Sequence, residues 1–273
     1  MTQLSHIRCF ILDMDGTFYL GDSLLPGALA FMDYLQCSDR DYLFLTNNSS
    51  CSASRYVDKL ARLGWQTDES HVLTSGEATA LYLKEKSPGA KVFLLGTPDL
   101  EDEVARHGFR LTDNNPDYVV LGFDKTLTYD KLVKACAFIT AGAPYIATHP
   151  DINCPTEDGF IPDCGAIMAC IKASTGRDPY IIGKPRAAII EAVFRRRPYP
   201  PSQTAIIGDR LYTDIATGKN ADITSILVLS GETKIGDLPA AEVTPDYVFD
   251  NLGVLRDELI RLDKVGGNPV RVL

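Results

Sequence analysis

Short apolar segments that end in polar residues and lead into an amphipathic helix recur along this chain of 273 residues. The first such segment, residues 10–12 (FIL), ends in Asp13 and Asp15. A second apolar run over residues 42–45 leads into Thr46 and Asn47, and helical spacing follows over 53–63. Repeated strand, loop and helix patterns are typical of parallel sheets with helical crossovers. We therefore expect an α/β fold with a Rossmann-like, doubly wound parallel-sheet core.

The middle of the chain continues this rhythm without acidic residues at its strand ends. Thr97 and Pro98 are expected to cap a helix with an acidic first turn, and Thr128 to cap another that ends near residue 140. The expected strands cover residues 91–95, 118–121 and 145–148. We therefore predict an α/β domain, residues 78–180, inserted into a core that consists of residues 1–77 and residues 181–273.

Four predicted strand ends carry polar side chains. Parallel strands joined by helices bring their carboxyl ends to one edge of the sheet, so residues distant in sequence are expected to converge there. These residues are Asp13 with Asp15, Thr46 with Asn47, Lys184, and Asp209 with Asp214.

The charges of this group indicate a bound cation. Carboxylates in close proximity raise one another's pKa unless a cation separates them. Four carboxylates with one ammonium group suit Mg²⁺, which prefers oxygen ligands. With a phosphate added, the residue types fit phosphoryl transfer, which needs a nucleophile, charge neutralisation and a proton donor.

The ordered segments DMDGT, LTNN, GKP and GDRLYTD resemble the four motifs of the haloacid dehalogenase-like (HAD) superfamily. Their separations are similar to those of the subfamily of NagD and the nitrophenyl and pyridoxal phosphate phosphatases. The resemblance covers essentially the whole chain. It implies an α/β cap domain of the C2 type between the second and third motifs, and a Mg²⁺-dependent phosphatase acting on small phosphorylated metabolites.

The resemblance also implies a role for each matched residue. Asp13 would attack phosphorus to give an aspartyl-phosphate, and Asp15 would act as acid and then as base. Thr46, the backbone of Asn47, and Lys184 would bind the phosphoryl oxygens. The metal ligands would be the Asp13 carboxylate, the Asp15 backbone carbonyl, Asp209, and Asp214 directly or through water.

Several alternatives stay open. The substrate could be a nucleoside monophosphate, a sugar phosphate, phosphoglycolate, pyridoxal phosphate or an aryl phosphate. Instead of a hydrolase, the chain could be a phosphomutase, a receiver-like phosphoacceptor or a phosphate-binding protein without turnover. The oligomeric state is also open, a homo-oligomer included.

Each site residue also has a simpler interpretation. Asp13 and Asp15 could form a turn after a strand, and Thr46 could cap a helix. Lys184 could be a solvated surface lysine. Asp214 could be explained by the helix dipole alone.

Two further features belong to the middle section. His149 has no visible partner, so we interpret it as a structural or exposed loop residue. The loop over residues 148–165, dense in Pro, Gly, Asn and Asp, is the leading candidate to contact the leaving group.

The formal net charge of −9 argues against nucleic acid or an anionic membrane as a partner. No apolar run reaches the length of a membrane span, and the N-terminus has no secretory pattern, so we expect a cytoplasmic protein. The seven cysteines form no CxxC pair and are expected to be reduced, with Cys9 and Cys136 in the core.

Overall fold

The computed structural model describes residues 4–156 and 159–266. Its contacts divide the chain into two compact units. The first unit comprises Met1–Leu45, Val57–Val72 and Pro185–Leu273, and the second comprises Thr46–Tyr56 and Leu73–Lys184. Assignment of residues 1–77 and 181–273 to a functional core, and of 78–180 to a cap, stays a prediction.

A six-stranded sheet in the order β15-β14-β13-β1-β4-β5 forms the centre of the first unit. Its strands are β1 (Cys9–Leu12), β4 (Asp41–Thr46), β5 (Val72–Thr74), β13 (Thr204–Gly208), β14 (Thr224–Val228) and β15 (Tyr247–Phe249).

The strand order of this sheet reverses at β1. From β1 the chain continues outward through β4 and β5, and later returns to the other side of β1 through β13, β14 and β15. β1 pairs in parallel with both β13 and β4, and all four of its residues are buried, as expected for a central parallel strand covered on both faces. This is the doubly wound pattern, so the predicted fold class is confirmed.

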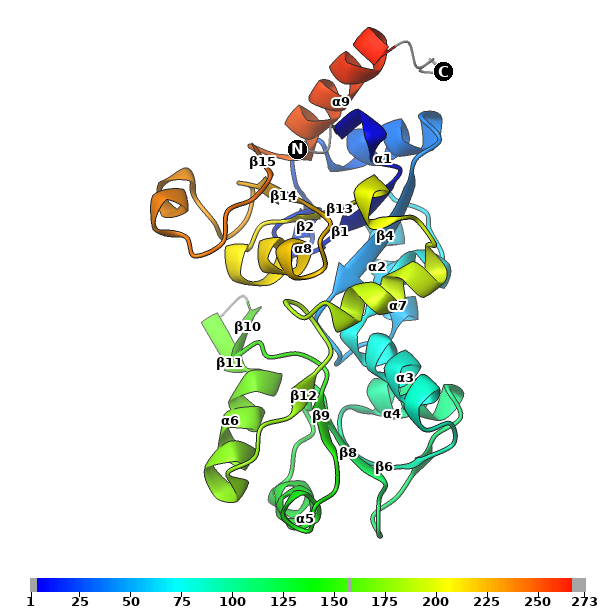
Figure 1. The fold of residues 1–273 in the computed structure, drawn as a ribbon, viewed down its shortest axis with the longest axis vertical. Helices are drawn as coiled ribbons and strands as arrows, with labels where there is room; N and C mark the ends of the chain where they lie inside the picture. Colours follow the sequence, from blue (N-terminus) through cyan, green and yellow to red (C-terminus); the bar gives the residue numbers. More distant parts are fainter. Residues whose placement is uncertain (1–3, 157–158, 267–273) are drawn as a thin grey trace. The chain divides into compact units, whose positions relative to one another are not determined.

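Helices flank this sheet. α1 packs against α9 (Figure 1), and the buried Arg40 guanidinium lies 2.7 Å from the Asp263 carboxylate of α9. The helices are α1 (Ala28–Cys37), α7 (Ala188–Arg196), α8 (Ala216–Asn220) and α9 (Leu252–Gly266), while α2 (Ala53–Arg62) contributes residues to both units. The sequence predicts a poorly ordered tail over residues 266–273. Of these residues only Gly266 is among those that the structure describes.

A short antiparallel hairpin follows β1. It consists of β2 (Tyr19–Leu20) and β3 (Ser23–Leu24). The turn formers of residues 19–27 predict a tight hairpin or loop, and the structure confirms the hairpin.

The second unit has its own five-stranded sheet in the order β12-β9-β8-β6-β7. The paired strands run parallel. The strands are β6 (Lys91–Leu95), β7 (Arg110–Leu111), β8 (Tyr118–Leu121), β9 (Tyr145–Ala147) and β12 (Tyr180–Ile181), and the helices are α3 (Ser75–Lys86), α4 (Pro98–Arg106), α5 (Tyr129–Thr140) and α6 (Cys164–Thr175).

The core of this unit lies between its central strands and two helices. Buried side chains of β6, β8 and β9 pack against those of α5 and α6. The predicted cap of α5 is confirmed, because the Thr128 hydroxyl accepts a hydrogen bond from the Lys131 N–H at 3.3 Å. Thr97 precedes α4 as predicted, but its hydroxyl donates to the Ser50 carbonyl at 3.0 Å and makes no capping bond.

The segment predicted to be a loop over residues 148–165 contains a second hairpin. β10 (Asn153–Thr156) pairs antiparallel with β11 (Gly159–Pro162). The segment is rich in Pro, Gly, Asn and Asp, which favour loops. Its two short strands show little alternation of apolar and polar residues, so the sequence did not predict them. The Phe160 side chain is 74% exposed, so the hairpin presents an aromatic ring to solvent.

Two predictions from composition can be compared with the structure. No helix of the described residues is both long and apolar enough to cross a membrane. All seven cysteines are free, Cys9 is buried, and Cys136 is half-buried against the core of the second unit.

Candidate active site

The first candidate catalytic residues lie in the loop that follows β1. The Asp13 N–H donates to the Ile207 carbonyl at 2.9 Å, which extends the pairing of β1 with β13 by one residue. The Asp13 side chain is half-buried and that of Asp15 is exposed. The parallel pairing therefore fixes Asp13 at the carboxyl edge of the sheet.

Three carboxyl groups meet at this edge within the first unit. Asp13, Asp209 and Asp214 each contribute one carboxylate oxygen, and these oxygens lie within 4.8 Å of one another. Asp209 and Asp214 are only 2% and 1% exposed, so water screens their charges poorly. Three oxygen donors this close, two of them buried and one half-buried, fit a divalent, oxygen-preferring cation.

Glycines allow the backbone to approach these carboxylates closely. A Cβ atom at Gly16 would lie 2.4 Å from Asp209 Oδ2, and one at Gly231 would lie 2.0 Å from the same oxygen. A Cβ atom at Gly208 would lie 2.1 Å from Asp214 Cγ. Since real Cβ atoms do not approach so closely, a side chain at any of these positions would displace an aspartate.

Backbone donors fix the direction of both buried carboxylates. The Glu232 N–H donates to Asp209 Oδ2 at 2.7 Å, and the Arg210 N–H donates to Asp214 Oδ2 at 3.2 Å. Asp214 lies in a π-helical turn, Leu211–Ile215, that follows β13. Burial would lower the pKa of Arg210, but anionic neighbours including Asp209 raise it, so the acidic group retains a cationic neighbour.

The predicted phosphate-binding residues lie together in the second unit. The Asn47 side chain joins the Lys184 backbone twice: its Oδ1 accepts the Lys184 N–H at 2.8 Å, and its Nδ2 donates to the Lys184 carbonyl at 3.0 Å. Gly183 permits this approach, since a Cβ there would lie 2.7 Å from Asn47 Oδ1. Lys184 is 3% exposed, so the interpretation as a solvated surface lysine is wrong.

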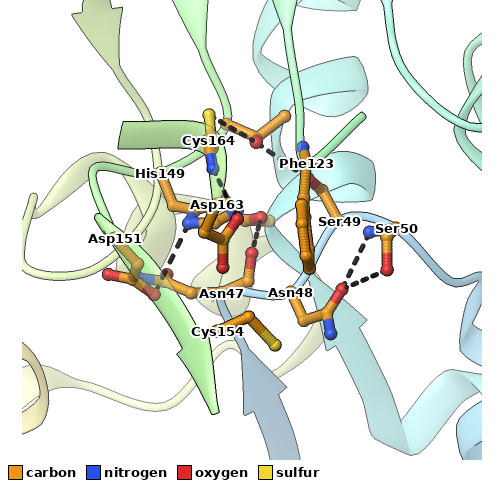
Figure 2. Close-up of polar contacts among 12 residues, drawn as sticks. Asn47, Asn48, Ser49, Ser50, Phe123, His149, Asp151, Cys154, Asp163 and Cys164 are labelled. Atoms are coloured by element: carbon orange, nitrogen blue, oxygen red, sulfur yellow. Dashed lines mark hydrogen bonds and ion pairs between the residues drawn. The ribbon is translucent and has the colours of Figure 1, made fainter. Parts of the chain in front are cut away.

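Thr46 lies immediately before Asn47, at the end of β4. Its hydroxyl accepts the Asn48 N–H at 3.1 Å, and the Asn48 side chain in turn accepts the N–H and the hydroxyl of Ser50 (Figure 2). The hydroxyl therefore organises a turn, and the next helix, α2, begins only at Ala53. The alternative that Thr46 caps a helix is not what the structure shows.

A third group of polar side chains was not predicted. The His149 side chain is fully buried, with Nδ1 3.4 Å from Asp151 Oδ2 and Nε2 3.5 Å from Asp163 Oδ1 (Figure 2). Of the two alternatives for His149, a structural or an exposed residue, the burial agrees with the structural one, and the two carboxylates are partners that the sequence did not reveal. The sequence offers little indication of the contact between His149 and Asp163, because Asp163 lies fourteen positions later and only folding brings it to the imidazole ring.

The structure thus places the predicted site residues in two groups. Asp13, Asp209 and Asp214 form one in the first unit, with Asp15 on the adjoining loop. Asn47 and Lys184 form the other in the second unit, with Thr46 next in sequence. That both groups act on one substrate stays a prediction.

Fold and site together define an α/β enzyme with an acidic centre at the carboxyl edge of a doubly wound sheet. Residues 10–110 match the haloacid dehalogenase-like hydrolase family, and residues 181–255 match a HAD-hydrolase-like family. The chain belongs to the haloacid dehalogenase-like hydrolases, and it is a phosphatase of the HAD type.

Individual relatives are similar over nearly the full length. An acid sugar phosphatase of Staphylococcus aureus (strain MRSA252) is 35% identical, over 94% of this chain and 99% of its own. A solved 4-nitrophenylphosphatase from Thermotoga maritima has a TM-score of 0.91 and 51% identity, over 94% and 98% of the two chains. A glycerol phosphate phosphatase from Mycobacterium tuberculosis, solved with magnesium, has a TM-score of 0.87 and 33% identity, over 94% and 79%. The predicted resemblance to the NagD and nitrophenyl phosphatase subfamily is confirmed.

Proposed function

We propose that this phosphatase hydrolyses phosphomonoesters of small metabolites in a Mg²⁺-dependent reaction through an aspartyl-phosphate. The proposal depends above all on the acidic group Asp13, Asp209 and Asp214, whose oxygens lie within 4.8 Å of one another. A half-buried aspartate beside two buried ones suits a nucleophile next to a metal site.

The chemistry assigned to the residues is a double displacement. An Asp13 carboxylate oxygen attacks phosphorus, and the bond from phosphorus to the ester oxygen breaks. Asp15, exposed on the adjoining loop, gives a proton to the departing oxygen and later takes one from the water that attacks the aspartyl-phosphate. Thr46, the Asn47 backbone and Lys184 bind the phosphoryl oxygens.

The carboxylates of Asp13, Asp209 and Asp214, with the Asp15 carbonyl, are the proposed ligands of Mg²⁺. When bound, the ion offsets the negative charge of the carboxylates and of the phosphoryl group. The magnesium bound to the Mycobacterium tuberculosis relative supports this choice of ion.

We propose sugar phosphates and glycerol phosphate as the first substrates to examine, because they appear in the names of similar phosphatases. Aryl phosphates serve as artificial substrates, as for the Thermotoga maritima relative. The hairpin of β10 and β11, with its exposed Phe160, is proposed to contact the leaving group. Cytoplasmic location is proposed on the free cysteines and the acidic composition.

The test of this function is release of inorganic phosphate from a panel of monoesters. With Mg²⁺, the purified protein is expected to turn over repeatedly, to lose activity with a chelator and to regain it when Mg²⁺ is added back. The panel repeated with an exchanged β10–β11 hairpin is expected to show a different substrate preference. A single burst of the alcohol leaving group, with the phosphoryl group retained on the protein and no steady release of phosphate, would favour the phosphoacceptor alternative. Activity indifferent to chelator would remove the metal from the proposal.

Gly231→Ala is expected to weaken the metal site, because its Cβ would lie 2.0 Å from Asp209 Oδ2 and displace that carboxylate. The Mg²⁺ concentration for half-maximal activity should rise about 10-fold or more, the scale seen when groups supporting metal ligands are altered. Gly236→Ala is the matched control, since a Cβ there meets nothing within 4 Å. Equal Mg²⁺ requirements in both variants would contradict the assignment of Asp209 as a ligand.

A further inference from the structure

The chain of contacts from His149 to Lys184 lies entirely within the second unit. Next to the ring of His149 is the Asp151 carboxylate, 3.4 Å away. That carboxylate accepts from Asn47 Nδ2 at 3.1 and 3.2 Å, and Asn47 bonds the Lys184 backbone at both its N–H and its carbonyl. A buried histidine is thereby connected, through two side chains, to the proposed phosphate-binding lysine.

Asp151 and the Lys184 backbone require the same orientation of the Asn47 amide. An ionised carboxylate only accepts hydrogen bonds, so Asn47 must present Nδ2 to it. The opposite end of the amide, Oδ1, then faces the Lys184 N–H and accepts it. With the amide reversed, two oxygens would face each other at Asp151 and two donors at Lys184.

His149 is placed to keep Asp151 in position. Its two ring nitrogens face Asp151 and Asp163, so whichever nitrogen carries a proton is directed at a carboxylate oxygen. At 3.4 and 3.5 Å both contacts are longer than an ordinary hydrogen bond, so His149 acts on the two carboxylates mainly as a close ion-pair partner. Asp163 is fixed in turn at the start of α6, where it accepts the Cys164 N–H.

The charge state of Asp151 agrees with this arrangement. Burial would raise the pKa of Asp151, but its contacts with His149 and Asn47 outweigh burial and lower the pKa. The carboxylate is therefore ionised near neutral pH and acts as an acceptor only.

We infer that His149 and Asp151 are positioning residues that hold the Asn47 amide in one orientation and thereby fix Lys184 for phosphoryl binding. The inference rests on the proposed function, in which Lys184 binds the phosphoryl oxygens. His149 and Asp151 are not proposed to contact the phosphoryl group. Lys184 remains the residue that contacts the phosphoryl group.

The test compares Asp151→Leu, which removes the acceptor, with Asp151→Asn, which keeps an amide oxygen for Asn47 Nδ2. Asp151→Leu is expected to lower kcat/KM for 4-nitrophenyl phosphate about 10- to 100-fold, the scale of a misplaced binding group. Asp151→Asn should recover most of this loss. The matched control is Glu103→Leu: Glu103 is also buried and contacts a histidine, His107, at 3.0 Å, in the same unit.

A second readout does not depend on activity. Hydrogen exchange of the Lys184 backbone amide, followed by NMR, should accelerate about 10-fold or more in Asp151→Leu, because its acceptor is no longer held in place. In Glu103→Leu the exchange rate of the Lys184 backbone amide should match that of the wild type. If Asp151→Leu does not fold, His149→Asn serves instead, with an expected acceleration of at least about threefold at the same amide.

The outcomes separate the two proposals. Unchanged Lys184 exchange in the Asp151 or His149 variant overturns the positioning role, as does faster exchange with unaltered kinetics, or an equal loss in Glu103→Leu. If the wild type releases no phosphate from any monoester, the proposed function fails, while the exchange rates still decide whether Asp151 fixes Lys184.

Discussion

Asp13→Asn is expected to abolish phosphatase turnover while the fold stays intact. An amide oxygen is a far weaker nucleophile than a carboxylate, so the aspartyl-phosphate should not form. Removing a nucleophile typically costs at least about 10³-fold in kcat. The substitution also relieves repulsion among three close carboxylates, so without Mg²⁺ the melting temperature should be no lower than that of the wild type. Steady-state hydrolysis of 4-nitrophenyl phosphate and thermal denaturation with chelator measure the two effects.

The control for Asp13→Asn is Asp33→Asn, the same change on the exposed face of α1. That variant should retain wild-type kcat and KM. An Asp13→Asn enzyme with wild-type turnover would refute the nucleophile assignment. A large drop in its melting temperature would instead indicate that Asp13 is needed for the fold.

The elements that could be predicted from sequence are those with strong local signals. The strands over residues 91–95 and 118–121 match β6 and β8, because each is an apolar run bounded by polar or turn-forming residues. The π-helical turn Leu211–Ile215 could not be predicted. It has no periodicity of its own and depends on how Asp214 folds back toward β13.

Some residues of the candidate site could likewise be predicted from the sequence, and others could not. Asp13, Asp209 and Asp214 could be predicted because aspartates that follow apolar strands are visible in the sequence, and the sheet topology brings them together. Asp151 and Asp163 could not, because their roles depend on contacts with His149 and Asn47 that arise only on folding. Their segment also has the composition of an ordinary loop.

Lys184→Met is expected to lower kcat/KM about 10²- to 10³-fold, the scale of losing one fixed donor to a developing charge. The Lys184 ammonium group is the predicted cationic partner of the phosphoryl oxygens. Methionine keeps the length and packing of the side chain but not its charge. Affinity for inorganic phosphate, measured by titration calorimetry, should fall with the rate, because a binding group serves the bound anion as well as the transition state.

Lys131→Met provides the matched control for this substitution. Lys131 also belongs to the second unit and forms an ion pair, with Nζ 2.8 Å from Asp124 Oδ2, so its loss should reduce stability without reducing phosphate affinity. If Lys184→Met and Lys131→Met had equal activities and phosphate affinities, Lys184 would be a structural lysine. The two groups of site residues would then not act on one substrate, because the second unit would contribute no charge to the reaction assigned to Asp13.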